Sequence, residues 1–271
     1  MSMAESLVAV ATPLPTRTAM PELSSDSKSI AMLDDDTPQP RHDAPVSLTS
    51  YRRTITMSNS DIERLSVKSR HRVKTYGEVF TPRSMVDQML NLVSDDLERG
   101  EGFVDKTFLE PAAGDGNFLV AILQRKLAAI EERFDSSVWS RESLFALASI
   151  YAIELLEDNH RDAQVALVNE FVTFHESHGT RCSPRADFYR AAVFIVEMNI
   201  VRGDTLTGRT LRGQEIEFSW WIRQIDDPSM VKREPFTFNS LREADAFDFA
   251  VYDRFEPCPV HHVHKNASAD A

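Results

Sequence analysis

The sequence predicts an α/β fold with a mainly parallel sheet and helices on both faces. From about residue 58, short apolar segments alternate with longer segments whose apolar residues recur at helical spacing. One apolar segment also runs into a glycine turn and then directly into a helix, as the first strand of an open α/β sheet does. The expected strands are residues 107–110, 150–154, 199–202 and 247–252.

The expected helices cover the segments between these strands, at residues 117–134, 142–148, 158–174 and 187–197. An earlier helix is expected with Thr81 as its cap and Pro82 as its first residue. Its apolar residues at helical spacing are Val86, Met89, Leu90, Val93 and Leu97. A hairpin is expected from residues 214–222 and 232–238, with Trp220 and Trp221 as hydrophobic anchors; stacking on bases is the alternative.

Composition divides the chain into three parts. Residues 1–56 are rich in Ser, Thr, Pro, Asp and Ala and lack a regular apolar period, so we expect a disordered tail. Residues 57–257 are expected to form the folded domain, and residues 258–271 a flexible tail. Met1 and Met57 both remain candidate starts. Cys258, His261, His262 and His264 are interpreted as part of the tail, with metal binding as the alternative.

The charge and hydropathy of the 271-residue chain limit the kinds of partner that it can bind. No segment approaches the roughly 18 apolar residues that a membrane span needs, and no signal peptide is recognisable, so we expect a cytoplasmic protein. Cys182 and Cys258 are expected to be free thiols. The net charge of −12 argues against a general nucleic-acid coat, so contact with DNA would be local or shared with a partner. The basic residues at 64–74 are interpreted as a solvated helix face, with phosphate contact as the alternative.

The glycine turn at Gly114 and Gly116 predicts a nucleoside site at the carboxyl edge of the sheet. Glycine there lets the backbone approach a ligand closely. A dinucleotide site would have a third glycine where this chain has Leu119, so the turn suits a nucleoside without a pyrophosphate. Glu110 is placed to accept a hydrogen bond from a cationic ammonium, and Glu154 to accept from both ribose hydroxyls. Asp204 follows the third strand, where an adenine amino group would lie.

These segments resemble, in chain order, the motifs of the gamma-type N6-adenine-specific DNA methyltransferases, the family of restriction–modification methylase subunits. The matching segments are residues 75–82 (Thr-Tyr-Gly-Glu-Val-Phe-Thr-Pro), 109–119 (the glycine turn), 151–154 and 199–206. The resemblance implies a Rossmann-like S-adenosylmethionine-dependent methyltransferase fold, with S-adenosylmethionine as cofactor and DNA as partner. The cofactor-binding residues that it implies are Phe80, Thr81, Pro82, Glu110, Pro111, Ala112, Gly114, Gly116, Asn117, Phe118, Glu154, Asp204 and Leu206.

The catalytic motif of that family, Asn-Pro-Pro followed by Tyr or Phe, is incomplete here. The chain has Asp253-Arg-Phe-Glu at this place. The resemblance as a whole implies methyl transfer to the N6 amine of adenine. Within the incomplete motif, Asp253 and Phe255 are the provisional catalytic residues. The alternative is a cofactor-binding subunit without catalytic activity, which works with a restriction, specificity or second methylase subunit. A third possibility is methyl transfer to an amine of a protein or a small molecule.

Overall fold

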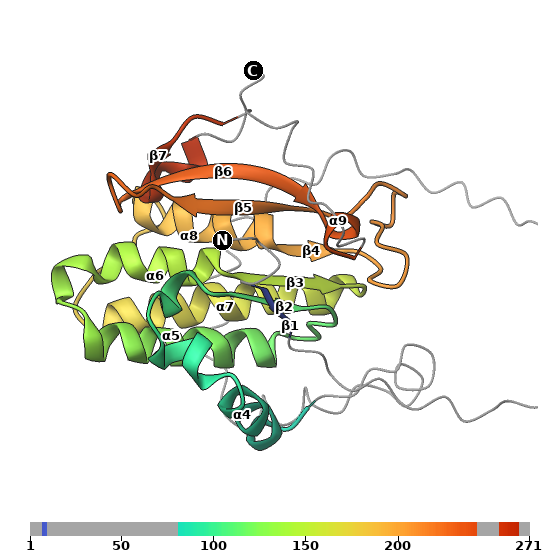
Figure 1. Cartoon of the computed structure of the whole chain (residues 1–271), viewed down its shortest axis with the longest axis horizontal. Helices are drawn as coiled ribbons and strands as arrows, with labels where there is room; N and C mark the ends of the chain where they lie inside the picture. Colours follow the sequence, from blue (N-terminus) through green and yellow to red (C-terminus); the bar gives the residue numbers. More distant parts are fainter. Residues whose placement is uncertain (1–6, 10–80, 243–254, 266–271) are drawn as a thin grey trace, which may run out of the picture.

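The computed structural model describes residues 7–9, 81–242 and 255–265. Within these residues the chain forms two sheets with helices between and beside them (Figure 1). The parallel sheet has the strand order β1-β2-β3-β4, and the antiparallel sheet has the order β5-β6-β7. The described part of the chain is therefore a mixed α/β structure built around a small parallel sheet.

The parallel sheet consists of β1 (Leu7–Ala9), β2 (Thr107–Glu110), β3 (Ile150–Glu154) and β4 (Ile200–Arg202). Every residue of β2 and β3 is buried, which explains why their apolar residues, Phe108-Leu109 and Ile150–Ile153, do not alternate with polar ones. Three expected strands are confirmed, the third starting one residue later than expected. The fourth, residues 247–252, lies outside the described residues.

β1 lies within the segment that was expected to be a disordered tail. Its three residues pair with Thr107, Phe108 and Leu109, on the side of β2 that faces away from β3. That edge of β2 would otherwise present unpaired N–H and C=O groups, and a short apolar Leu-Val-Ala segment satisfies them. Residues 10–56 lie outside the described residues.

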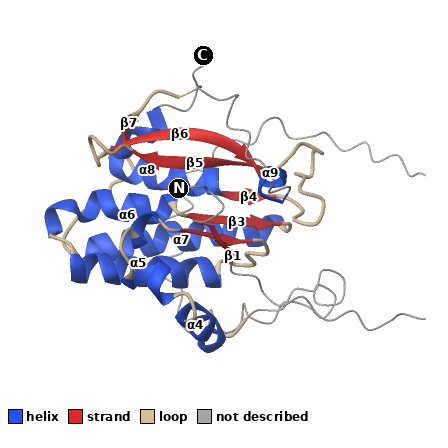
Figure 2. Ribbon diagram, in the orientation of Figure 1, coloured by secondary structure: helices blue, strands red, loops and turns tan. Residues whose placement is uncertain are grey.

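Helices connect the parallel strands (Figure 2). α5 (Asn117–Arg133) and α6 (Trp139–Ala148) follow β2, and α7 (Glu157–Ser177) and α8 (Asp187–Asn199) follow β3. All four were expected. α6 begins at Trp139 and not at residue 142 because a 3-10 turn, η5 (Ser136–Val138), leads into it.

The first helix is shorter than the sequence predicted. α4 (Arg83–Asn91) is followed by a π-helical turn, η3 (Asp95–Arg99), so the regular helix ends before Leu97. Pro82 occupies the N-cap position without a side-chain hydrogen bond, so Thr81 is not the cap. Leu97 is nevertheless buried. The apolar face was therefore predicted correctly, whereas the regular helical backbone along it was not.

The two faces of the parallel sheet pack against different layers. Phe108 on β2 lies beneath the ammonium of Lys126 from α5, 5.1 Å from the ring centre. Tyr151 projects from the opposite face, since its register partner is Leu109 and not Phe108. The Tyr151 ring packs against Phe218, Trp220 and Phe236. Strands of the second sheet therefore cover a face where helices were expected.

The second sheet begins with the expected hairpin. β5 (Glu217–Arg223) and β6 (Met230–Thr237) are antiparallel, with Trp221 opposite Arg233, and α9 (Phe238–Arg242) follows. The Trp221 indole is buried and donates to the side chain of Asn199 (2.9 Å). The two tryptophans are therefore anchors of the hairpin, as the first of the two interpretations expected.

The last described segment is folded, although a flexible tail was expected from residue 258. Cys258–Pro259 form β7 on the edge of β6, and Val260–Lys265 form a 3-10 helix, η6, against α8. Val260 and Val263 are buried. Asp187, the first residue of α8, accepts a hydrogen bond from the Lys265 ammonium (2.6 Å), and the rings of His262 and His264 each lie 3.2 Å from the same carboxylate. Two buried valines in a histidine-rich segment explain why composition alone suggested a tail.

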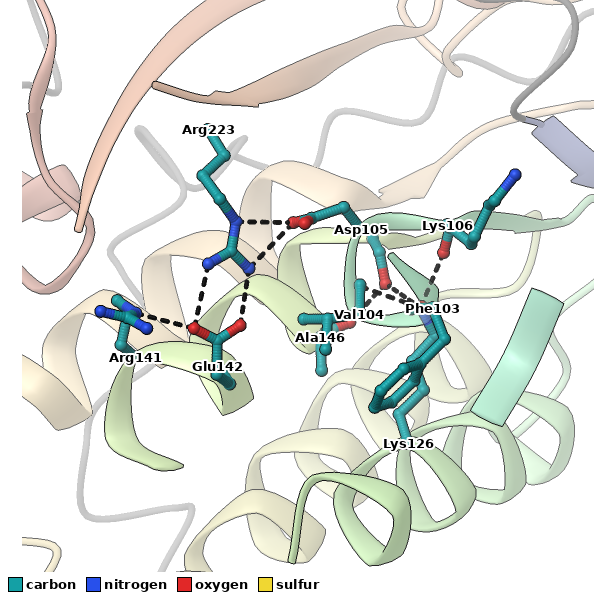
Figure 3. Close-up of polar contacts among 10 residues, drawn as sticks. Phe103, Val104, Asp105, Lys106, Lys126, Arg141, Glu142, Ala146 and Arg223 are labelled. Carbon is teal, nitrogen blue, oxygen red and sulfur yellow. Dashed lines mark hydrogen bonds and ion pairs between the residues drawn. The ribbon is translucent and has the colours of Figure 1, made fainter. Parts of the chain in front are cut away.

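An ion network fastens the second sheet to the helical layer (Figure 3). The Arg223 guanidinium, from the end of β5, makes a bidentate contact with the Glu142 carboxylate of α6 (3.0 and 2.8 Å). Its Nε donates to Asp105 (3.1 Å), in the 3-10 turn η4 (Phe103–Asp105). The guanidinium also lies 3.7 Å from the centre of the Phe145 ring. Because Glu142 is buried, this contact is shielded from water and holds the two layers in one arrangement.

Lys126 is a fully buried lysine that holds the end of η4 (Figure 3). Its ammonium donates to three backbone carbonyls and one hydroxyl, those of Phe103 (2.9 Å), Val104 (3.0 Å), Lys106 (2.7 Å) and Ser149 (2.8 Å). Burial lowers the pKa of this amine to about 7, although the Asp105 and Asp96 carboxylates oppose that shift. The side chain therefore supplies donors to the carbonyls at the end of η4, of which that of Phe103 also accepts from the Lys106 N–H (3.3 Å).

We predict that Lys126→Met lowers the free energy of unfolding by about 3 kcal/mol, because the buried carbonyls lose their donor. Urea denaturation at neutral pH measures the loss. Lys106→Met is the matched control, since the Lys106 side chain is 27% exposed and makes one ion pair with Asp96 (3.5 Å). The control is expected to lose no more than about 1 kcal/mol. Similar losses in the two variants would contradict the structural role given to Lys126.

Candidate functional site

The carboxyl ends of β2, β3 and β4 lie at one edge of the parallel sheet, since the strands run in the same direction (Figure 2). Glu110 ends β2 and Glu154 ends β3. Asp204 comes after β4, separated from it by Gly203. The three carboxyl groups that the sequence placed around one ligand therefore come from three neighbouring strand ends.

The glycine turn leads from β2 into α5 and is attached to β3. Gly114 (φ 57°) and Gly116 (φ 96°) have left-handed backbone conformations, which glycine adopts without strain. The Ala113 N–H donates to the Ile153 carbonyl (3.0 Å), and the Gly114 N–H donates to the Glu154 carboxylate (2.7 Å). The expected turn is therefore present and is positioned by the strand beside it.

Gly116 is needed for packing against a helix. A Cβ atom on Gly116 would lie 2.9 Å from the Cα and 3.2 Å from the Cβ of Ala163, in α7. The sequence predicted that both glycines let a ligand approach. At Gly116 the group that approaches is the backbone of α7, so this glycine sets how closely α7 packs beneath the turn.

We predict that Gly116→Ala destabilises the fold by more than about 2 kcal/mol, because a left-handed backbone and a steric overlap act together. Gly179→Ala is the control, since Gly179 also has a positive φ (79°) but a Cβ there would meet nothing within 4 Å. That control is expected to lose about 1 kcal/mol, the backbone effect alone. Equal losses on chemical denaturation would show that the contact with Ala163 is unimportant.

Glu110 is a buried carboxyl with an unused acceptor atom. Its side chain is 1% exposed, and its Oε1 accepts from the Ala112 N–H (3.0 Å). Among the described residues, its Oε2 has no hydrogen-bond partner. Burial raises the pKa of Glu110 to about 7; the Ala112 N–H opposes this rise and the Glu154 carboxylate adds to it. A buried acceptor of this kind suits a cationic donor from a ligand.

Glu154 holds three segments together at the end of β3. One carboxylate oxygen accepts from Gly114, and the other accepts from the Leu156 N–H at the start of α7 (2.9 Å). Its backbone carbonyl accepts from the Gly203 N–H (3.0 Å). The side chain is 7% exposed. Glu154 thus lies where the sequence placed an acid for ribose, and it also organises the surrounding backbone.

The loop after β4 carries Asp204 in a tight turn. The Leu206 N–H donates to Asp204 Oδ1 (2.9 Å), and the Gly208 N–H donates to the Asp204 carbonyl (2.8 Å). The Leu206 side chain is 78% exposed. Thr205 between them donates its hydroxyl to the Pro111 carbonyl (2.5 Å), in the loop after β2. Sequence reasoning did not select Thr205, because a single loop hydroxyl has no distinguishing pattern.

The remaining cofactor-binding candidates lie around this edge with different exposures. Pro111 is half-buried, and Ala112 and Asn117 are exposed. Phe118 is 4% exposed and belongs to the hydrophobic core at the start of α5.

Residues 75–82, the first segment that resembles a methyltransferase motif, are only partly described. Thr81 is half-buried and Pro82 exposed, and Phe80 lies outside the described residues. α4, which follows Pro82, packs against α5, and Arg83 donates to the side chain of Gln124 (2.7 Å). The segment therefore reaches the helix that begins at the glycine turn.

The two provisional catalytic residues are not brought to the site by the described structure. Phe255 lies on the second sheet, with its ring 4.5 Å from the Arg233 guanidinium. That guanidinium also contacts Met198, which precedes β4, and so lies toward the amino edge of the parallel sheet. The glycine turn and Asp204 are at the opposite edge. Asp253 lies outside the described residues.

Within residues 81–242 and 255–265, no three His, Cys, Asp or Glu side chains form a group able to hold a metal ion. Neither Cys182 nor Cys258 forms a disulfide, as the sequence predicted.

None of the helices in the described ranges has the length and apolar character that crossing a bilayer requires.

No protein-family model matches the chain, and no curated protein or solved structure matches it.

Proposed function

We propose that the chain binds S-adenosylmethionine at the carboxyl edge of its parallel sheet and acts in methylation of the N6 amine of adenine in DNA, within a restriction–modification system of the cytoplasm. The observation that carries the proposal is Glu110. Its carboxyl group lies beside the glycine turn and has a buried oxygen without a partner among the described residues, which suits a ligand that brings its own positive charge. The ordered motifs along the sequence support the same family.

The side chains at this edge fit the parts of that cofactor. Glu110 would accept from the ammonium of its methionine part, Glu154 from its ribose hydroxyls, and Asp204 from its adenine amine. The turn through Gly114 allows close approach of the backbone. When bound, S-adenosylmethionine supplies an electrophilic methyl group. The residues of the chain hold and orient it, and no metal or covalent nucleophile is required for attack by an amine.

A second candidate is favoured by the position of Phe255. In that candidate the chain binds the cofactor but works as a subunit beside a restriction, specificity or second methylase chain. Phe255 is packed on Arg233 of the second sheet and is therefore not placed to stack on a base at the carboxyl edge. The net charge of −12 also favours a shared DNA contact, since the phosphates of DNA repel an acidic surface.

We predict that binding of S-adenosylmethionine releases most of one proton at about pH 6. Burial raises the pKa of Glu110 to about 7, so the carboxyl is mainly protonated there; a bound ammonium lowers that pKa and drives the proton off. Calorimetric titrations in two buffers of different ionisation enthalpy measure the release. Glu110→Gln is expected to abolish it and to weaken binding at least about tenfold, whereas Glu132→Gln at an exposed site keeps both. Equal heats in the two buffers for the unmodified protein would exclude Glu110 as the ammonium acceptor.

We predict that the purified chain transfers labelled methyl groups from S-adenosylmethionine to unmethylated genomic DNA, with the label recovered in N6-methyladenine. Asp253→Ala is expected to abolish this activity, and Phe255→Leu to retain it because Phe255 packs on Arg233. Protein that binds the cofactor but transfers no label would favour the subunit candidate. Label found in protein or small molecules, and not in DNA, would refute adenine as the acceptor.

A further inference from the structure

The loops after β2 and β4 are joined directly, although these strands are not neighbours. β3 lies between them, so β2 and β4 are separated by roughly 10 Å at the usual spacing of about 4.8 Å between strands. The Thr205 hydroxyl nevertheless reaches the Pro111 carbonyl (2.5 Å). The loop after β4 therefore crosses over the end of β3, where Glu154 lies.

This crossing completes a ring of hydrogen bonds around Glu154. Gly114 attaches the loop after β2 to the Glu154 carboxylate, and Gly203 attaches the loop after β4 to its carbonyl. Thr205 then links the two loops to each other. The 7% exposure of Glu154 agrees with a carboxylate that is enclosed on both sides.

Asp204 belongs to the same hydrogen-bonded turn as the crossing loop. The Asp204 carboxylate is fixed by the Leu206 N–H, and its main chain is fixed by a two-way contact with Arg209 (2.9 and 3.3 Å). Thr205 lies inside this turn. The contact between Thr205 and Pro111 therefore sets how far Asp204 lies from the glycine turn.

We propose that Thr205 is a positioning residue that sets the spacing between Asp204, on the adenine side, and the glycine turn that is attached to Glu154, on the ribose side, and so selects ligands that contain adenosine. The inference rests on the proposed nucleoside site. Thr205 acts through the backbone of both loops and touches neither the methyl group nor its acceptor. Its effect therefore falls on the adenosine part of a ligand, while the ammonium contact at Glu110 is unchanged.

The test measures the affinities of S-adenosylmethionine and 5′-methylthioadenosine, which lacks the ammonium, for four variants. Thr205→Val and Thr205→Ala are expected to weaken binding of both ligands about five- to tenfold, the effect of one lost hydrogen bond. Thr205→Ser keeps the hydroxyl and is expected to bind within about twofold of the unmodified protein. Thr207→Val is the matched control, since the exposed Thr207 hydroxyl contacts only its own turn at the Asp204 carbonyl (3.3 Å) among the described residues.

Proton release on binding S-adenosylmethionine reports on Glu110 alone. It therefore distinguishes an effect on the ammonium contact from an effect on the adenosine contacts at Glu154 and Asp204. Thr205→Val is expected to release the same number of protons as the unmodified protein, at lower affinity. Unchanged affinities with a lowered melting temperature would show a purely structural Thr205 and overturn the inference, while the proposed function stands. An unmodified protein that binds neither ligand would overturn the proposed function and this inference with it.

Discussion

The Glu154 carboxylate connects the parts of the molecule on which the site depends. The carboxylate accepts from the backbone N–H groups of Gly114, in the glycine turn, and Leu156, just before α7. The backbone carbonyl of Glu154 accepts from Gly203, in the loop after β4. An acid with these contacts keeps the ends of β2, β3 and β4 at fixed distances from one another. The glycine turn is therefore shaped by the strand beside it as much as by its own glycines.

Hydrogen bonds and charges buried away from this edge keep the layers in place. Asn199 joins the second sheet to the parallel sheet, since it accepts from the Trp221 indole and donates to the carbonyls of Ala148 and Ile150. Arg223 and Lys126 add charged contacts on the helical side. Groups of this kind stabilise one arrangement of two packed layers because any shift leaves a buried donor or acceptor unsatisfied. Apolar contacts alone, which have no direction, would allow small displacements of one layer against the other.

Sequence patterns predicted the local elements well and the contacts between them poorly. β2 and β3 were predicted to the residue because each holds an unbroken apolar stretch that ends at an acidic residue, Glu110 or Glu154. The break in the first helix after Asn91 was missed, since a π-helical turn keeps Leu97 in the core and preserves the apolar spacing. The folded segment after residue 258 was missed because Val260 and Val263, its two buried apolar residues, stand among histidines.

At the site too, the sequence predicted the local elements and not the contacts between them. The order of Glu110, the glycine turn, Glu154 and Asp204 along the chain predicted their meeting at one sheet edge, because parallel strands end together. The link from Thr205 to Pro111 depends on how a loop crosses a strand, and no spacing in the sequence encodes that path. The placement of Phe255 likewise depends on β6, to which the last described segment attaches through β7.

The contact between Gly116 and Ala163 gives the chain a constraint that spans two distant segments. A larger residue in α7 at position 163 would push against the backbone of the turn, just as a larger residue at position 116 would push against α7. Glycine has no side chain to give up, and the closest overlap is with the Cα of Ala163, so a larger residue at one position cannot be offset by a smaller one at the other. Among descendants of this chain, both positions are therefore expected to keep small residues, while the exposed positions of α7 change freely.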